Sequence, residues 1–515
     1  MNKAFQAIKL NSALLRNAAS LVGSTGVTSV LGFIYWWLAA RQFSPAAVGF
    51  ASATISATSL LGMFGILGLG TLLVGELPRQ QSQKAPLIST ALIVVGGAGL
   101  GLGVLFSALA PSISTSFQSL AANPENILLF ALGVSFTSIS SVLDQALIGL
   151  LQGGLQLWRN ALFAVVKLVA LFLIGLWLTK ATGIAIYTTW TIGNVVSLLV
   201  LGIIALFRGV RPGKNLLPQF GFLRKLGPQA IKHHALNLTL QAPTMILPVL
   251  VTVALSATAN AWFYVSWNLS GIGNIIISSL TMVLYAVSAA QPRILARRIR
   301  LTLGLAFLAC LAINAIFFLG TRQILELFGH GYAEQAALSL RLLSLESFLF
   351  IIKSHYVAVR RIHGRVAPTA LITIATGALE VGASTLGVHL GGLTGLSLGW
   401  LSAMGIEAAL MSPTVYRAAR FAPRTLSKSR EKLFAEDLES LAPGEPAWQV
   451  DTLIQPVWLG DTLTLHAISL PKRVPETTLL SNDESESEWY SGRTIRLANF
   501  LWYSEQETLE LPVQK

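Results

Sequence analysis

The chain has 515 residues, of which 53% are hydrophobic and only 11% are charged, and its mean hydropathy is +0.65. Soluble domains average about 25% charged residues, because they must cover their surface with polar groups. The composition therefore excludes a large soluble core and predicts a protein whose solvent is lipid. The single cysteine, Cys310, excludes an intrachain disulfide framework.

The net charge of +13 divides unevenly along the chain. Residues 1–420 hold 27 lysines and arginines against 8 aspartates and glutamates, whereas residues 421–515 hold 9 against 15. Most basic residues of the first part lie between apolar runs, which indicates membrane topology rather than nucleic-acid binding. The tail is acidic.

Twelve apolar segments are long enough to cross about 30 Å of hydrocarbon as helices. Lys3, Lys9 and Arg16 lead into the first of them without a small-residue cleavage site, so no cleavable signal is predicted. The predicted spans are 19–40, 46–74, 87–110, 127–150, 160–179, 183–207, 233–254, 262–288, 301–320, 339–358, 367–388 and 393–412.

The positions of the basic residues support this count. If the N-terminus is cytoplasmic, the even-numbered links and the start of the tail are cytoplasmic too. Together with the N-terminal lead they hold 25 lysines and arginines, whereas the outward links hold 4. Positive charge is enriched in cytoplasmic links. The pattern predicts twelve spans with both termini in the cytoplasm.

The longest basic link, about 208–232, divides the spans into two halves, residues 1–210 and 211–420. Trp190 and Trp400 follow Gly183 and Gly392 at similar distances in spans six and twelve. Two halves of the same orientation suggest a parallel repeat about an axis along the membrane normal. We therefore expect an all-α integral membrane protein with two six-helix lobes.

The tail, residues 421–515, is expected to be a small soluble appendage, partly ordered at most. The alternating run from Asp461 to His466 is typical of a short strand, and an acidic cluster covers residues 483–488. No recognisable chemistry lies in this tail.

Ionisable groups inside spans are costly and are therefore functional candidates. Lys167, Lys353, Asp144, Glu380 and Glu407 lie within predicted spans. Lys353 is near the cytoplasmic end of its span, where its head could snorkel to the interface. Asp144 could pair with Lys167 on the neighbouring helix, and Glu380 needs a partner or a proton.

Glycine and proline mark two spans. Small residues let helices approach closely in lipid, so the glycines of span three predict tight packing. Prolines in span seven predict an interruption of this helix, either an opening where it lines a cavity or a simple packing kink. The residues concerned are Gly96, Gly97, Gly99, Gly101 and Gly103 in span three, and Pro243 and Pro248 in span seven.

Signals for an enzyme are poor. The sequence has no Cys or His cluster with metal-ligand spacing, no phosphate loop and no serine elbow. The longest outward link, 321–338, carries Glu326, His330 and Glu334, which is thin evidence for catalysis. We predict no catalytic residue, no metal and no cofactor.

Four short motifs follow one another along residues 10–420. They are Leu38–Gly49 (LAARQFSPAAVG), Leu327–Tyr332 (LFGHGY), Tyr356–Arg365 (YVAVRRIHGR) and Gly391–Trp400 (GGLTGLSLGW). Each motif alone is weak, and their order on the twelve-span frame makes the combination specific. In this order they resemble the polysaccharide and O-antigen flippases of the multidrug/oligosaccharidyl-lipid/polysaccharide (MOP) exporter superfamily.

The resemblance implies two lobes around a central cavity, as in MATE transporters, with alternating access and the plasma membrane of a prokaryote as location. The implied cargo is an undecaprenyl-diphosphate-linked oligosaccharide for cell-surface polysaccharide, including lipopolysaccharide. Besides this cargo, membrane lipids and other polysaccharide-assembly proteins are the expected partners, and nucleic acid is not.

A diphosphate group needs cationic partners in a low-dielectric cavity. The candidates are Arg16, Arg41, Lys167 and Lys353, of which Arg41 also matches the motif of the family. Candidates for ion coupling or for structural pairing are Asp144, Glu380 and Glu407.

Three alternatives remain open. A cation-coupled drug or metabolite exporter of the MATE type shares the fold, but such relatives commonly carry an acidic residue in the first span, and this chain has none there. The flippase of the lipid-linked peptidoglycan precursor usually has more spans than the twelve found. A membrane-embedded polysaccharide polymerase or ligase would need a large external loop with catalytic residues, which is missing.

Overall fold

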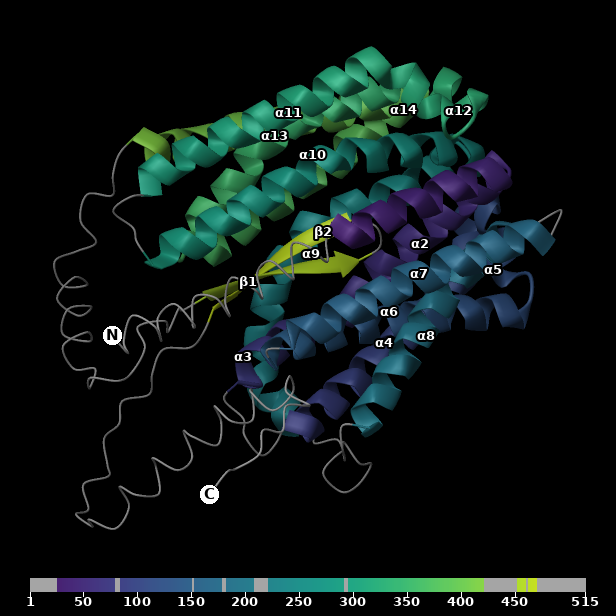
Figure 1. Ribbon diagram of the computed structural model, residues 1–515, viewed down its shortest axis with the longest axis horizontal. Helices are drawn as coiled ribbons and strands as arrows, with labels where there is room; N and C mark the ends of the chain where they lie inside the picture. The colour runs from purple at the N-terminus through teal and green to yellow at the C-terminus, as the bar shows by residue number, and fades with distance from the viewer. Residues whose placement is uncertain are drawn as a thin grey trace, which may run out of the picture. The chain divides into compact units, whose positions relative to one another are not determined.

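The computed structural model describes residues 26–78, 84–150, 152–177, 182–207, 221–290, 295–420, 452–459 and 462–469. Long helices make up almost all of the described part up to residue 420 (Figure 1). After a helix over residues 26–42, they are α2 (Pro45–Gly65), α3 (Leu69–Glu76), α4 (Lys84–Ile113), α5 (Gln118–Ala121), α6 (Pro124–Gly149), α7 (Gly153–Trp177), α8 (Gly183–Phe207), α9 (Gly221–Ala254), α10 (Ala257–Ala290), α11 (Leu295–Glu326), α12 (His330–Gln335), α13 (Ala337–Ile362) and α14 (Val366–Arg420), with a short 3-10 helix, η1 (Thr115–Phe117), before α5.

Every predicted span corresponds to a helix. In the described part of the chain, 10 helices are long and apolar enough to cross a membrane. One of these, α14, covers the last two predicted spans, and the helix over residues 26–42 covers the described part of the first. The all-α membrane fold expected from the sequence is thus confirmed.

The second predicted span is broken into two helices. The Ser44 side chain accepts a hydrogen bond from the Ala47 amide (3.3 Å) and caps the start of α2, with Pro45 in the first turn. Leu67 and Gly68 then adopt positive φ angles of 50° and 78°, which a helix cannot contain. The chain therefore restarts at α3 within the same span.

Helix α14 is 55 residues long, which would measure about 80 Å if straight, far more than a bilayer. It bends at Gly391 and Gly392, where the φ of Gly392 is 57°. A Cβ on Gly387 would overlap the Gly395 carbonyl, and one on Gly399 would overlap the Ala383 carbonyl. Gly387 is therefore next to Gly395, and Ala383 is next to Gly399. Because the residue number rises in one half as it falls in the other, the two halves of α14 are antiparallel spans.

The glycines of α4 divide into two groups. A Cβ on Gly103 would lie 2.5 Å from the Ala131 Cα, and one on Gly99 would lie 2.9 Å from the Ser135 Cα. Gly97 and Gly101 instead face open space. The predicted close packing is therefore real on one face of α4, which crosses α6, whereas the opposite face is available to lipid.

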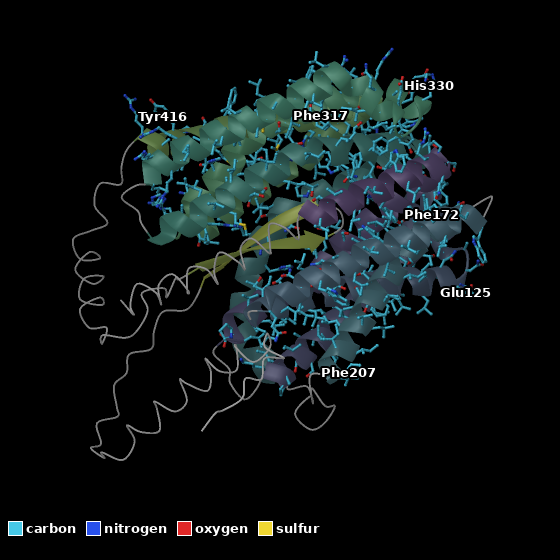
Figure 2. The ribbon with its side chains drawn as sticks, viewed as in Figure 1. Glu125, Phe172, Phe207, Phe317, His330 and Tyr416 are labelled. Atoms are coloured by element: carbon cyan, nitrogen blue, oxygen red, sulfur yellow. The ribbon has the colours of Figure 1, made fainter. Side chains whose placement is uncertain are left out.

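The outer surfaces of the helices are apolar, whereas polar groups turn inward. Along α11 the buried side includes Thr302, Asn314 and Thr321, and the exposed side carries large apolar side chains such as Leu308 and Leu319. This inverted arrangement suits a lipid solvent. Figure 2 labels His330 and Glu125, from two predicted outward links, at one end of the helices and Tyr416 at the other.

Helix α9 differs from the prediction at its prolines. It continues as one helix from Gly221 to Ala254, so Pro243 and Pro248 do not interrupt it. The hydroxyl groups of Thr244 and Thr252 donate to backbone carbonyls within the same stretch, at 2.8 and 2.9 Å. Hydroxyl groups of this kind help a membrane helix to tolerate proline.

The two predicted halves meet where α2 and α10 begin. Asn260 of α10 donates to the Gly49 carbonyl (2.8 Å) and to the Ser52 hydroxyl (2.9 Å) of α2. The rings of Trp36 and Tyr264 pack edge to face at 4.7 Å in a core shared by both halves. The described residues up to residue 469 form one compact unit, and the division into two lobes at residue 210 stays a prediction.

The described part of the tail is an antiparallel hairpin of β1 (Thr452–Leu459) and β2 (Thr462–Ser469). Its register pairs Thr452 with Ser469 and Leu459 with Thr462. Most of the alternating run that predicted a strand lies in β2. The acidic cluster at 483–488 lies outside the described residues.

The glycine contacts of α4 give a matched test. Gly103→Leu should lower the melting temperature of the purified protein in detergent, because its side chain would displace α6, and overpacking typically costs about 1–3 kcal/mol or more. Gly101→Leu adds the same side chain on the open face and should leave the melting temperature unchanged or raised. Equal effects of the two substitutions would contradict the packing described for α4 and α6.

Candidate functional site

Carboxylate groups concentrate in the interior of the helices. Residues 1–420 contain 8 aspartates and glutamates, all described, and four of them, Asp144, Glu346, Glu380 and Glu407, are almost fully buried. A buried charge in a membrane protein is costly unless it has partners. Asp144 and Glu346 line two cavities, one in each predicted half, and Glu380 and Glu407 contact Lys353, which lines the second cavity.

The N-terminal cavity has a volume of about 50 Å³, room for several waters at about 10–15 Å³ each. Helices α6, α7 and α8 supply most of its wall. On α6 the polar positions are 137, 140, 141 and 144, a helical spacing that places them on one face. The full lining is Thr28, Thr137, Ser140, Ser141, Asp144, Arg159, Asn160, Phe163, Ala164, Lys167, Trp190 and Asn194.

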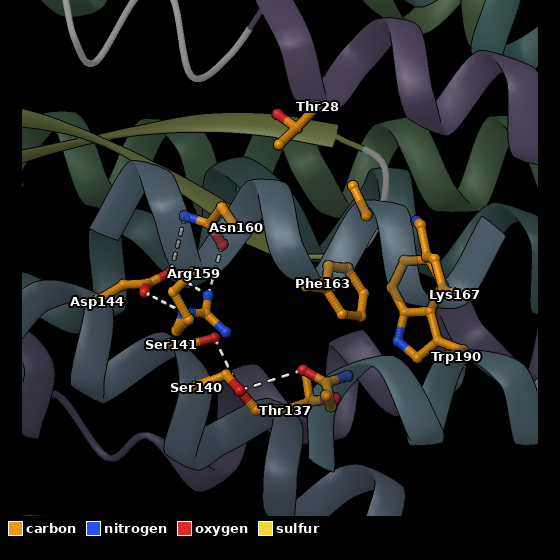
Figure 3. Close-up of a pocket in the computed structure, with 12 residues that line it drawn as sticks. Thr28, Thr137, Ser140, Ser141, Asp144, Arg159, Asn160, Phe163, Lys167 and Trp190 are labelled. Carbon is orange, nitrogen blue, oxygen red and sulfur yellow. Dashed lines mark hydrogen bonds and ion pairs between the residues drawn. The ribbon is translucent and has the colours of Figure 1, made fainter. Parts of the chain in front are cut away.

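A bidentate ion pair lies at one end of this cavity (Figure 3). Arg159 Nε and Nη2 donate to the two carboxylate oxygens of Asp144 at 2.7 and 2.6 Å. Asn160 connects to both, accepting from Arg159 Nη2 at 2.5 Å and donating to Asp144 at 3.3 Å. Nη1 of Arg159 has no hydrogen-bond partner among the described residues, so one donor of this guanidinium faces the cavity unused.

Lys167 lies at the other end of the N-terminal cavity, against aromatic rings (Figure 3). Its Nζ is 3.9 Å from the ring centre of Trp190 and 4.9 Å from those of Tyr35 and Phe163. Aromatic faces attract a cation. The charged side chains among the described lining residues are Arg159, Lys167 and Asp144, two basic groups and one carboxylate.

The C-terminal cavity is larger, about 190 Å³, and is formed by α9, α10, α13 and the second half of α14. Its wall consists of apolar and polar side chains together with three ionisable groups, Glu346, Lys353 and Arg361. The full lining is Leu240, Gln241, Thr244, Trp267, Asn268, Ser270, Gly271, Asn274, Ile275, Ser278, Thr281, Met282, Glu346, Phe350, Lys353, Ser354, Val357, Ala358, Arg361, Trp400 and Met404.

Lys353 holds two carboxylates from the two halves of α14. Its Nζ is 2.6 Å from Glu380 and 3.0 Å from Glu407, and all three side chains are at least nine-tenths buried. Thr376 donates a further hydrogen bond to Glu407 at 2.6 Å. One ammonium for two carboxylates leaves the cluster with an excess of negative charge unless a proton or a cation is added.

Several polar atoms at the C-terminal cavity lack a hydrogen-bond partner within the described ranges. They are Gln241 Oε1, Asn274 Oδ1, Trp400 Nε1, and Nε and Nη2 of Arg361. Gln241 and Arg361 are only 4% and 8% exposed, so bulk water does not readily satisfy them. Buried groups of this kind are normally hydrogen-bonded in folded proteins. Their convergence on one cavity indicates a site for a polar ligand.

The structure brings together most of the site residues predicted from the sequence. Lys167 and Lys353 line the two cavities, and Lys353 is buried in ion pairs rather than snorkelling. The predicted pairing of Asp144 with Lys167 is wrong, because Arg159 on the same helix as Lys167 takes both oxygens of Asp144. Arg41 is exposed at the end of its helix and lines neither cavity, and Arg16 lies outside the described residues.

Sequence reasoning missed Arg159 and Arg361, because both were counted as cytoplasmic link residues. Glu346 and the amides and tryptophans of the C-terminal cavity were not among the predicted site residues. The spacing offered a signal, since Glu346 and Lys353 are seven residues apart and therefore share one face of α13.

The buried pair of Asp144 and Arg159 gives a test of the geometry. Asp144→Ala should lower the melting temperature strongly, because removing one partner of a buried pair costs about 3–5 kcal/mol. The double variant Asp144→Ala/Arg159→Met should be more stable than the two single effects predict, since it leaves no unpaired charge. Melting of the four proteins in detergent measures this coupling, and additive effects would show that the two side chains do not form a pair.

Comparison with known proteins places this geometry in context. The chain matches the family described as "Polysaccharide biosynthesis protein" over residues 14–290, more than half of its length. No curated protein sequence matches it.

Solved structures of MATE transporters share the fold. The inward-facing conformation of a multidrug resistance MATE transporter of the MOP superfamily has a TM-score of 0.61 at 16% identity and covers 78% of this chain and 96% of that one. An outward-facing conformation gives 0.51 at 17% identity, covering 80% and 96%. A MATE in the bent conformation gives 0.52 at 16% identity, covering 82% and 97%.

The family match and the shared architecture agree with the family that the sequence motifs resemble. The protein is a multi-pass membrane protein with a MATE-like fold, and the chain belongs to the polysaccharide biosynthesis protein family.

Proposed function

We propose that this protein flips undecaprenyl-diphosphate-linked oligosaccharide from the inner to the outer leaflet of a prokaryotic plasma membrane, for surface polysaccharide. It would act by alternating access as a transporter, not as an enzyme, with both termini in the cytoplasm. Membership of the polysaccharide biosynthesis protein family and the MATE-like fold support this proposal.

The observation that carries the proposal is that two basic side chains line the N-terminal cavity inside membrane spans. Arg159 and Lys167 are buried there with Asp144 as the one carboxylate among the described lining residues. A diphosphate carries negative charge and several acceptor oxygens, which an arginine donor and an ammonium group satisfy. Lys167 is the central residue of this proposal, and Arg159 adds the unused donor Nη1.

Alternating access needs contacts that can open at one end. The described contacts of Asn260 with Gly49 and Ser52 join the two predicted halves near a predicted outward link. The Trp37 indole adds a hydrogen bond to the Leu327 carbonyl (3.0 Å) at the same end. We propose that these contacts close the outer side in one state and separate in the other.

The cluster of Lys353, Glu380 and Glu407 is our candidate for ion coupling. A net negative charge in a membrane interior favours uptake of a proton or a metal cation. Because Glu380 and Glu407 come from the two antiparallel halves of α14, neutralising them changes the force that holds both halves to α13. Such coupling also suits the second candidate function, a cation-coupled exporter of drugs or metabolites.

Lys167 provides the first test of the proposed function. Lys167→Met should lower surface polysaccharide at least tenfold in cells that depend on this protein, because the buried charge for the diphosphate is lost. Lys167→Arg should retain part of the function, since it keeps the charge over the aromatic rings. Surface polysaccharide, quantified beside the amount of protein in the membrane, measures the effect.

The control for this test is Lys84→Met, which removes a partly exposed lysine at the start of α4 that lines neither cavity. It should leave surface polysaccharide unchanged. Normal polysaccharide with correctly inserted Lys167→Met protein would contradict the role of the cationic cavity.

The coupling cluster provides a separate test. In proteoliposomes, an imposed proton or sodium gradient should accelerate flipping of a lipid-linked saccharide by the unchanged protein. Glu407→Gln, with one carboxylate left for Lys353, should flip at a rate that no longer depends on the gradient. This cluster does not couple transport if the gradient leaves flipping by the unchanged protein unaffected. The same conclusion follows if the gradient accelerates the Glu407→Gln variant as much as the unchanged protein.

A further inference from the structure

The C-terminal cavity is chemically different from the cationic N-terminal cavity. Two tryptophans, Trp267 of α10 and Trp400 of α14, line it with their rings edge to face at a centre distance of 5.1 Å. The Phe263 ring stacks on Trp267 at 5.6 Å and fixes its orientation. The cavity therefore has one rigid aromatic wall.

Polar groups surround this wall. The indole of Trp400 lies next to the Glu346 carboxylate, and Asn274 donates to Glu346 at 3.2 Å. Two amide oxygens of the cavity, Gln241 Oε1 and Asn274 Oδ1, have no hydrogen-bond partner among the described residues and can accept from a ligand. The cavity thus offers two amide acceptors and a carboxylate beside two aromatic rings.

This combination matches the chemistry of a sugar ring. A pyranose presents C–H groups on its faces, which pack against aromatic rings, and hydroxyl groups on its rim, which donate to amide and carboxylate oxygens. Ligand sites in general combine apolar walls with a few placed polar groups. The volume of about 190 Å³ is many times the 10–15 Å³ or so that one water needs.

A cation lies away from the aromatic wall along the same cavity. Glu346 and Arg361 are 15 residues apart on α13 (361 − 346), which corresponds to about 22 Å along the helix. Arg361 is buried, and its Nε and Nη2 have no partner in the part of the chain that the structure describes. An elongated ligand with a sugar at one end and an anionic group towards the other fits this arrangement.

We propose that the C-terminal cavity binds the saccharide of the cargo, with a sugar ring against Trp267 and Trp400 and hydroxyl groups on Gln241, Asn274 and Glu346. Arg361, farther along the same cavity, receives an anionic group on a more distant sugar of the same saccharide. This inference rests on the proposed function, because it assumes one cargo whose diphosphate binds the basic residues of the N-terminal cavity and whose saccharide binds the C-terminal cavity. It assigns sugar selectivity to residues of α9, α10, α13 and α14.

The test measures binding to the full-length protein in nanodiscs. The probes are farnesyl diphosphate and its esters with glucose, galactose, N-acetylglucosamine or glucuronic acid. At least one sugar-bearing probe should bind about tenfold more tightly than the sugar-free probe. Trp267→Leu should remove this preference, whereas Trp267→Phe should retain most of it because an aromatic face remains.

Matched variants separate sugar binding from folding. Trp262→Leu removes a tryptophan on the same helix that does not line the cavity, and it should keep the sugar preference. Gln241→Leu replaces one amide with little change of volume and should lower the sugar preference several-fold. This variant keeps the test usable if the Trp267 variants fold poorly.

The outcomes distinguish this inference from the function on which it rests. Equal affinity of the unchanged protein for sugar-bearing and sugar-free probes would overturn the saccharide site and leave diphosphate binding standing. The same holds if a sugar preference exists but survives in both Trp267→Leu and Gln241→Leu. Failure of every probe to bind would overturn the proposed function, and this inference with it.

Discussion

The high cost of an uncompensated charge in hydrocarbon governs the arrangement of these helices. Each buried carboxylate of residues 1–420 has a polar partner on another helix or within a cluster. Asp144 binds Arg159, Glu346 accepts from Asn274, and Glu380 and Glu407 share Lys353. The helices that carry these groups must therefore pack in one register, since a rotation of any of them would expose a charge to lipid. The same requirement places the polar residues in the interior, where they line the two cavities.

Small residues make this arrangement possible. Glycines let α4 lie directly on α6 and let the two halves of α14 touch along their backbones, as the contacts of Gly103 and Gly387 indicate. The bend at Gly391 and Gly392 turns one long apolar segment into an antiparallel pair, which is why Glu380 and Glu407, far apart in sequence, reach the same lysine. A close backbone approach thus brings the ionic cluster together, and the cluster in turn holds α13 against both halves of α14.

The two cavities differ in chemistry, which suits the binding of two different parts of one ligand. The N-terminal cavity is small and is lined by two basic side chains and one carboxylate, whereas the C-terminal cavity is larger and combines aromatic rings with amides and a carboxylate. A cargo with a diphosphate and a saccharide has one part for each kind of surface. Trp190 and Trp400, which occupy similar positions in spans six and twelve, each line one of the cavities, as a parallel repeat with diverged chemistry would arrange them.

Hydropathy and charge were sufficient to predict the spans, since apolar length and the placement of basic residues are local properties that a membrane imposes directly. They also identified Lys167, Lys353, Asp144, Glu380 and Glu407, because any charge inside an apolar run stands out. Only the tertiary structure decided which charges meet. Arg159 rather than Lys167 neutralises Asp144, and Arg361 points to a cavity although its position near a helix end resembles an ordinary cytoplasmic anchor. Amides and tryptophans such as Gln241 and Trp267 are common in membrane helices, so their role becomes visible only when packing collects them around one empty space. Composition reports the solvent of each segment, whereas a site depends on distances between segments, which the packing of the helices sets.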